Sequence, residues 1–128
     1  MELDLTQLFK HSDGIFEFAP FSTIFEEGSP GDCMYVLLEG DVTISIKATD
    51  VWQVREGEIF GEMALIDHRP RSATAIARTS VRAARIDDER FMFMVQQTPF
   101  FSLHVMRVIV TRLRALDETI TEKLSQNS

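Results

Sequence analysis

Between residues 15 and 86 the hydrophobic positions fall in short segments separated by glycine, proline, aspartate or serine, which is typical of consecutive β-strands. Residues 34–40 read as a buried strand that ends at a glycine turn, and residues 42–46 alternate with a period of two. Another strand contains residues 52–54, and residues 48–50 are the expected hairpin connection before it. Many short strands of this kind favour a barrel or a sandwich.

A helical pattern follows the strands. Asp87 or Asp88 can cap a short helix through residues 91–95, and the Thr-Pro pair after it breaks that helix. A long second helix is expected over about residues 100–124, and a short opening turn of helix over residues 3–11. The predicted fold class is therefore mainly β with flanking helices, in which a short helix and a long C-terminal helix follow the strands.

The long helix carries a second apolar pattern besides the one that packing on the strands requires. Five apolar residues are spaced three, four, three and four apart, as in the seam of a coiled coil: Met106, Ile109, Leu113, Leu116 and Ile120. Arg112 and Asp117 would then flank the seam as an opposite-charge pair across a parallel dimer. We therefore expect a homodimer, and the alternative is a helix that packs only on its own strands.

Composition fits one globular domain over residues 1–128, with 45% hydrophobic and 26% charged residues. No apolar run reaches the eighteen or so residues of a membrane span, and the chain begins without a secretion signal, so we expect no membrane partner. Cys33 is the only cysteine, which favours a reducing, cytoplasmic location and a structural thiol. A net charge of −7 argues against nucleic acid as a partner.

The candidate chemistry lies in residues 60–75. Gly61 lets the backbone approach a ligand closely, and the residues after Glu62 can begin a helical turn whose N–H groups point at an anion. Arg71 offers a planar fork that matches phosphate oxygens. An ionised Glu62 only accepts hydrogen bonds, so it suits a hydroxyl group and repels a phosphate. The pattern indicates a site for a small anion with a neighbouring hydroxyl.

This segment resembles the phosphate-binding cassette of the cyclic-nucleotide-binding domain family, and the resemblance extends over roughly residues 18–116. It implies a β-jelly-roll barrel over about residues 15–86 with C-terminal helices over about 88–124. It also implies that Glu62 binds the ribose 2′-hydroxyl and that Arg71 pairs with the cyclic phosphate. The other implied binding residues are backbone or neighbouring positions of the cassette: Gly61, Met63, Ala64, Ser72 and Ala73.

The resemblance leaves the base open between cAMP and cGMP. A hydroxyl at Ser72 can accept from the guanine 2-amino group, and some family members use an acid on the long helix, here Asp117, to bind guanine. We favour cAMP, with cGMP as the competitor. Bacterial relatives often continue into a helix-turn-helix module, whereas this chain ends at Ser128, so we expect the signal to pass to a separate effector protein, with the long helix as the switch.

Nothing in the sequence favours an enzyme. The three histidines are scattered, no spacing is typical of a metal site, and His68 beside Asp67 reads as a solvent-exposed loop pair. We therefore predict a non-enzymatic, metal-free receptor for cAMP or cGMP. The alternative is a ligand-independent interaction or dimerisation module on the same fold.

Overall fold

The structure is a computed structural model that describes residues 5–9 and 14–126, with the side chains of Gln7 and residues 116–126 outside the described set. Within these described residues, eight strands and four helices follow one another. In order they are α1 (Leu5–Phe9), β1 (Ile15–Phe18), β2 (Thr23–Phe25), β3 (Cys33–Glu39), β4 (Val42–Ile46), β5 (Thr49–Val54), β6 (Ile59–Phe60), α2 (Glu62–Asp67), β7 (Thr74–Ala77), β8 (Val81–Asp87), α3 (Asp88–Gln97) and α4 (Pro99–Gln126).

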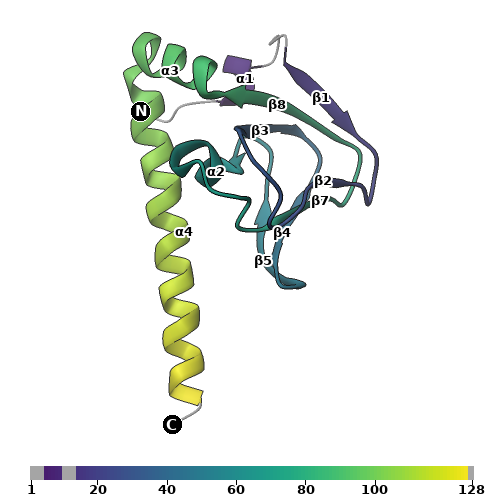
Figure 1. Cartoon of the computed structure of the whole chain (residues 1–128), viewed down its shortest axis with the longest axis vertical. Helices are drawn as coiled ribbons and strands as arrows, with labels where there is room; N and C mark the ends of the chain where they lie inside the picture. The colour runs from purple at the N-terminus through teal and green to yellow at the C-terminus, as the bar shows by residue number, and fades with distance from the viewer. Residues whose placement is uncertain (1–4, 10–13, 127–128) are drawn as a thin grey trace.

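The strands form two antiparallel sheets of four, in the orders β1-β8-β3-β6 and β2-β7-β4-β5 (Figure 1). The predicted barrel is therefore two separate sheets whose edges do not join by hydrogen bonds in the described chain. Apolar side chains of both sheets fill the space between them, with Leu37, Val54 and Phe60 fully buried there. This packing is that of a sandwich, which was the second architecture that the strand pattern allowed.

A second core lies between the first sheet and the helices. Met34 and Val36 on β3 pack there with Phe9 of α1 and with Phe101 and Val105 of α4. Successive side chains of a strand point to opposite faces, so β3 contributes to both cores. That double burial explains why the segment is apolar without alternation, as parallel central strands are in other folds.

The helix boundaries follow the predicted signals. The Asp87 carboxylate accepts a hydrogen bond from the Arg90 N–H at 2.9 Å and caps α3. Thr98 ends α3 and Pro99 begins α4, which runs past α2 and extends beyond the sheets (Figure 1). Among the helices of the described chain, none combines the length and the apolar character that a bilayer-spanning segment requires.

The β4–β5 hairpin differs from its prediction. The turn consists of Lys47 and Ala48, with φ angles of 50° and 65°, so residues 49–50 already belong to β5 rather than to the connection. Two consecutive positive φ angles match the tight twist of a two-residue hairpin. In β4 the polar residues of the alternating pattern are the buried ones. Thr43 and Ser45 are buried, whereas Ile44 and Ile46 line a pocket.

Candidate ligand pocket

The pocket begins where β6 turns into α2. Gly61 has φ 74° and is the N-cap of α2, so no side chain occupies the helix start. A Cβ at this position would lie 2.8 Å from Arg71 Nη1 and 3.1 Å from the Phe25 ring, which only glycine avoids. The predicted role of Gly61 as the point of close backbone approach fits this geometry.

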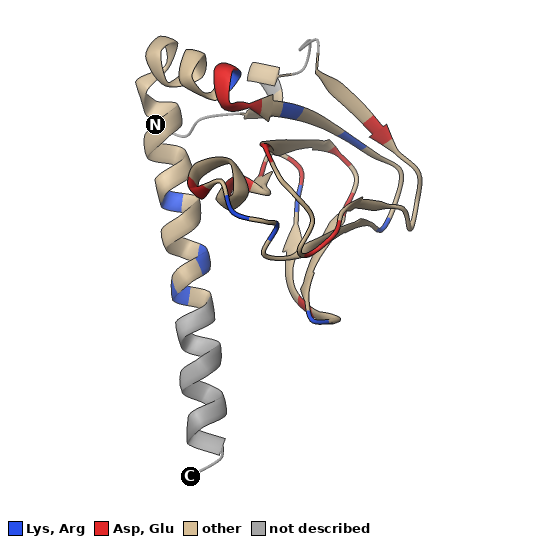
Figure 2. Cartoon of the chain, in the orientation of Figure 1, with Lys and Arg blue, Asp and Glu red and all other residues tan. Residues whose placement is uncertain are grey.

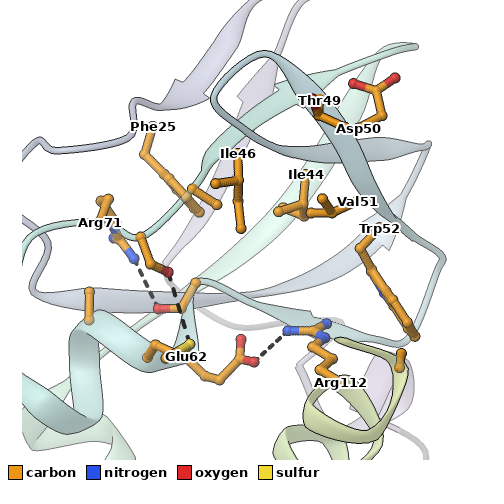
Figure 3. Close-up of a pocket in the computed structure, with 16 residues that line it drawn as sticks. Phe25, Ile44, Ile46, Thr49, Asp50, Val51, Trp52, Glu62, Arg71 and Arg112 are labelled. Carbon is orange, nitrogen blue, oxygen red and sulfur yellow. Dashed lines mark hydrogen bonds and ion pairs between the residues drawn. The ribbon is translucent and has the colours of Figure 1, made fainter. Parts of the chain in front are cut away.

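Arg71 is held in place by contacts within the chain. Its side chain is 5% exposed, and it donates to the Gly61 carbonyl at 2.9 Å (Figure 3). It also donates to Cys33 Sγ at 3.4 Å. Its guanidinium carbon lies 4.2 Å from the centroid of the Phe25 ring, a cation–π distance. Its Nε is buried and without a partner among the described atoms, so the group retains donor capacity.

Cys33 and Tyr35 form the layer behind Arg71. The Cys33 thiol is buried, as expected for a structural thiol, although its contact with Arg71 was not predicted. Tyr35 stacks on Phe60 with ring centroids 5.3 Å apart. Burial, and then the neighbouring Cys33, raises the pKa of Tyr35 to about 12. The layer behind Arg71 therefore contains an aromatic side chain that stays uncharged at neutral pH.

The pocket has a volume of about 390 Å³, within the range of small-ligand sites. One side is the α2 turn with Arg71, and the opposite side is an apolar wall from β4 and β5 (Figure 3). Four side chains of that wall are Ile44, Ile46, Val51 and Trp52. An anion-binding end facing an apolar slot suits a molecule with a phosphate and a flat, weakly polar group.

Arg112 reaches the pocket from α4. Its Nη1 donates to Glu62 Oε1 at 2.5 Å, and its Nη2 donates to the Ile59 carbonyl. The expectation that Arg112 flanks a coiled-coil seam as a partner of Asp117 is wrong, because the guanidinium faces the pocket. The helix places Arg112 on its inward face, in line with the buried Phe101 and Val105.

Seven of the eight predicted site residues line this one pocket: Gly61, Glu62, Met63, Ala64, Arg71, Ser72 and Ala73. The eighth, Asp117, has a side chain outside the described residues. Ser72 Oγ lies 3.9 Å from Met63 Sδ, so both ends of the cassette meet across the anion-binding side.

Sequence reasoning missed the residues that other elements bring to the pocket. Phe25, the hairpin residues 49–52, Arg112 and Ala115 all line it. A signal for Arg112 existed, because the inward residues of α4 are spaced four, three, four and three apart: Phe101, Val105, Val108, Arg112 and Ala115. Arg112 is the one charged member of that stripe.

Other chemistry is sparse in the described chain. Its residues include no group of three or more histidine, cysteine, aspartate or glutamate side chains that could hold a metal ion. His68 ends α2 and its Nδ1 lies 4.0 Å from an Asp88 carboxylate oxygen, with both side chains more than half exposed. Such an exposed pair contributes little to stability, and it lies outside the set of pocket-lining residues.

The chain is similar to known regulators. A CRP-like cAMP-activated global transcriptional regulator of Mycobacterium tuberculosis is 30% identical over 111 residues, which are 83% of this chain and 50% of the regulator. This chain thus spans half the length of that relative. The Thermus thermophilus catabolite activator protein has a TM-score of 0.76 at 24% identity, covering 87% of this chain and 54% of that one.

A further solved structure is the cGMP-bound form of the EAL enzyme Bd1971, 32% identical, with a TM-score of 0.63 over 88% of this chain and 31% of that chain. The likeness to the activator protein confirms the predicted jelly-roll-like fold of antiparallel strands followed by helices, with sheets that stay open. The model of the cyclic nucleotide-binding domain matches residues 15–98, so the chain belongs to the cyclic nucleotide-binding domain family, as its cassette predicted.

Proposed function

We propose that this chain is a receptor module that binds a purine 3′,5′-cyclic monophosphate without acting on it chemically. The observation that carries the proposal is the buried Arg71 on the same pocket as the buried Glu62, opposite an apolar wall. Arg71 would pair with the cyclic phosphate, assisted by the Met63 and Ala64 amides. Glu62 would accept the ribose 2′-hydroxyl, and Ile44, Ile46 and Trp52 would cover the base.

The balance of charge in the pocket supports a cyclic phosphate over a chain of phosphates. A cyclic diester carries one negative charge, which a single guanidinium and nearby amides can match. Glu62 is an anion-repelling group at the same turn, so a di- or triphosphate would place charge beside a buried carboxylate. Its pairing with Arg112 reduces that repulsion but does not turn the carboxylate into a donor.

Ser72 bears on which nucleobase the pocket would bind. Ser72 is exposed and lines the pocket, where its hydroxyl can serve a purine edge. A relative named as cAMP-activated and a structure named as cGMP-bound support both ligands. We propose cAMP as the preferred ligand, as the sequence favoured, with cGMP as its competitor.

We also propose that α4 forms a homodimer through its outward face. Met106, Val110 and Leu113 are 58%, 47% and 54% exposed, and their spacing of four and three places them on one stripe. Such an exposed apolar stripe on a long helix is typical of a protein interface. A second copy of α4 fits it best, since two identical apolar stripes are complementary in length and character. The stripe differs from the predicted seam at Ile109, which packs on the core.

We further propose that α4 acts as the switch, that the signal passes to a separate effector protein, and that both proteins lie in the cytoplasm. Neither nucleic acid nor a membrane is proposed as a partner of this module, whose net charge is −7. Figure 2 shows acidic as well as basic residues over the strands, whereas the coloured part of α4 carries basic residues alone.

Calorimetric titration with cAMP, cGMP and linear 5′-AMP tests the function. We expect saturable binding of at least one cyclic nucleotide and far weaker binding of 5′-AMP, whose phosphate carries a second charge. Ligand at one hundred times its dissociation constant should stabilise the fold by about 2.7 kcal/mol. If neither cyclic nucleotide binds or raises the melting temperature, while light scattering still shows a dimer, the ligand-independent interaction module is the correct reading.

A further inference from the structure

Ser72 lies in an exposed segment that connects α2 to β7. Residues 66–70 and Ser72 are exposed, whereas Arg71 between them is buried. The segment follows the last residue of α2, Asp67, and ends before the first residue of β7, Thr74. Exposed, irregular segments are the parts of a folded protein that other enzymes reach most readily.

The charge ahead of Ser72 distinguishes it from the other hydroxyl residues of the chain. Of all the serine and threonine residues in the sequence, only Ser72 and Thr74 follow a lysine or arginine by three positions. For Ser72 that residue is Arg69, which is exposed and outside the pocket lining. For Thr74 it is Arg71, which is only 5% exposed. An accessible cation ahead of an accessible hydroxyl is a charge pattern by which a serine kinase with an acidic substrate groove selects its substrate.

The Ser72 hydroxyl is only weakly held. It donates to Met63 Sδ at 3.9 Å, and a thioether is a weak acceptor. Because Ser72 and Arg71 line the same pocket, a phosphate on Ser72 Oγ would lie at the anion-binding side. Arg71 Nε is buried and without a partner among the described atoms, so this guanidinium can still donate to a phosphate.

The pocket offers one guanidinium to an anion. Two arginines line it, and Arg112 already pairs with the Glu62 carboxylate, apart from Arg71 (Figure 3). A phosphoserine carries a charge of about −1.5 to −2 near neutral pH. Beside Arg71, that charge would occupy the donor on which a cyclic phosphate depends and would repel the cyclic phosphate as well.

We propose that Ser72 is a phosphorylation site and that its phosphate competes with the cyclic phosphate for Arg71, which keeps nucleotide out of the pocket. The competition rests on the proposed function, whereas the phosphorylation does not. Ser72 Oγ attacks the γ-phosphorus of a nucleoside triphosphate, the bond from that phosphorus to the β–γ bridging oxygen breaks, and a nucleoside diphosphate leaves. The hydroxyl proton passes to a base of the kinase.

The first experiment treats the folded full chain with magnesium ATP and a serine kinase that selects arginine three positions before its acceptor. Mass spectrometry should find phosphate on Ser72, while circular dichroism stays that of the untreated protein. Arg69→Leu should slow the transfer at least about tenfold and keep wild-type nucleotide affinity, because Arg69 does not line the pocket. A folded wild type without phosphate on Ser72, or an Arg69→Leu chain modified at the wild-type rate, overturns the phosphorylation site.

The second experiment measures by calorimetry how cAMP and cGMP bind to the phosphorylated and unmodified chains. Phosphorylation should weaken the binding at least about a hundredfold. Two variants separate charge from size at this position, since Ser72→Glu should weaken binding at least about tenfold more than the uncharged Ser72→Gln of the same shape. Equal affinities of the two chains overturn the competition, and so do equal losses in the two variants.

The competition is reciprocal, so saturating cyclic nucleotide should slow phosphate transfer to Ser72 in the unmodified chain. An unchanged rate overturns the competition. If the unmodified chain binds neither cyclic nucleotide, the proposed function and the competition are overturned, while mass spectrometry still decides whether Ser72 is a phosphorylation site. If the chain binds nucleotide equally well with phosphate on Ser72, the proposed function stands and this inference is overturned.

Discussion

At the scale of single residues, Arg71 is held in one position by its own neighbours. Arg71 is fixed by a carbonyl, a thiol and an aromatic face, and Gly31 lies so close that a Cβ there would be 2.5 Å from Arg71 Nε. A side chain held in this way would lose little further freedom on binding the proposed ligand.

Arg71→Leu should weaken cyclic nucleotide binding by about 2–5 kcal/mol, because the phosphate would lose a desolvated charged partner. Arg69→Leu is the control, since Arg69 is exposed and does not line the pocket. Calorimetry on both variants checks the assignment, with circular dichroism to establish that each is folded. Wild-type affinity in a folded Arg71→Leu protein would contradict the role of the arginine.

Tyr35 allows a test of the layer behind Arg71, because it is the only tyrosine and its ionisation can be followed alone. Burial raises its pKa to about 12, so the absorbance change of tyrosine ionisation should have its midpoint near that pH in the folded protein. In denaturant the midpoint should return to about 10. The unfolded chain thus loses its proton first, so the stabilising effect is intact below about pH 10 and is lost as the pH rises toward 12.

A midpoint near 10 while circular dichroism still reports the native fold would show that Tyr35 is not buried as described.

The cassette could be predicted from the sequence, but the residues that other elements bring to the pocket could not. Gly61, Glu62 and Arg71 lie within eleven positions, so their shared chemistry can be recognised as a local sequence pattern. Arg112 reaches the site only because α4 packs with Phe101 and Val105 inward, which is a tertiary choice. The helix carries two apolar stripes, and the sequence alone does not decide which of them faces the sheets.

At the scale of elements, the two faces of α4 differ in what they contact. The inward face buries Phe101 and Val105 and carries Arg112, and the outward face exposes Met106, Val110 and Leu113. A helix with apolar residues on both faces has a second partner to bury against. The element therefore brings the pocket and the proposed dimer stripe within one helix turn of each other.

The double change Val110→Asp and Leu113→Asp should convert a dimer to a monomer, because it places two charges on the outward stripe without touching the core. Thr111→Asp, exposed between them, is a control that adds a charge beside the stripe. Light scattering with saturating nucleotide measures the outcome. A monomeric wild type under these conditions would refute the dimer, and a dimeric double variant would refute this surface as its interface.

The strands were predicted better than their turns. Apolar periodicity located β3, β4 and β5 because burial imposes it on every residue of a strand. The β4–β5 turn was misplaced because Lys47 and Ala48 are not the Asn or Gly that usually mark positive φ. Here the register of the flanking strands imposes the turn on residues that do not prefer it.

At the scale of the whole molecule, the described chain forms three layers, which are the two sheets and the helices that pack on the first sheet. One core lies between the two sheets and another between the first sheet and the helices. The sequence indicated the order of strands and helices, and so the fold class. It did not distinguish a closed barrel from two open sheets, because side-chain alternation is the same in both and closure depends on which edges pair.

The β4–β5 hairpin has a consequence for how this molecule can diverge. β5 is the outer strand of its sheet, and the hairpin carries the apolar wall that would face the base of the proposed ligand, whereas the proposed phosphate end lies on the separate segment from Gly61 to Ala73. Val51 and the exposed residues near it can change without opening either core. A duplicated copy could therefore acquire a preference for another nucleobase through hairpin mutations alone, while inheriting its phosphate end intact.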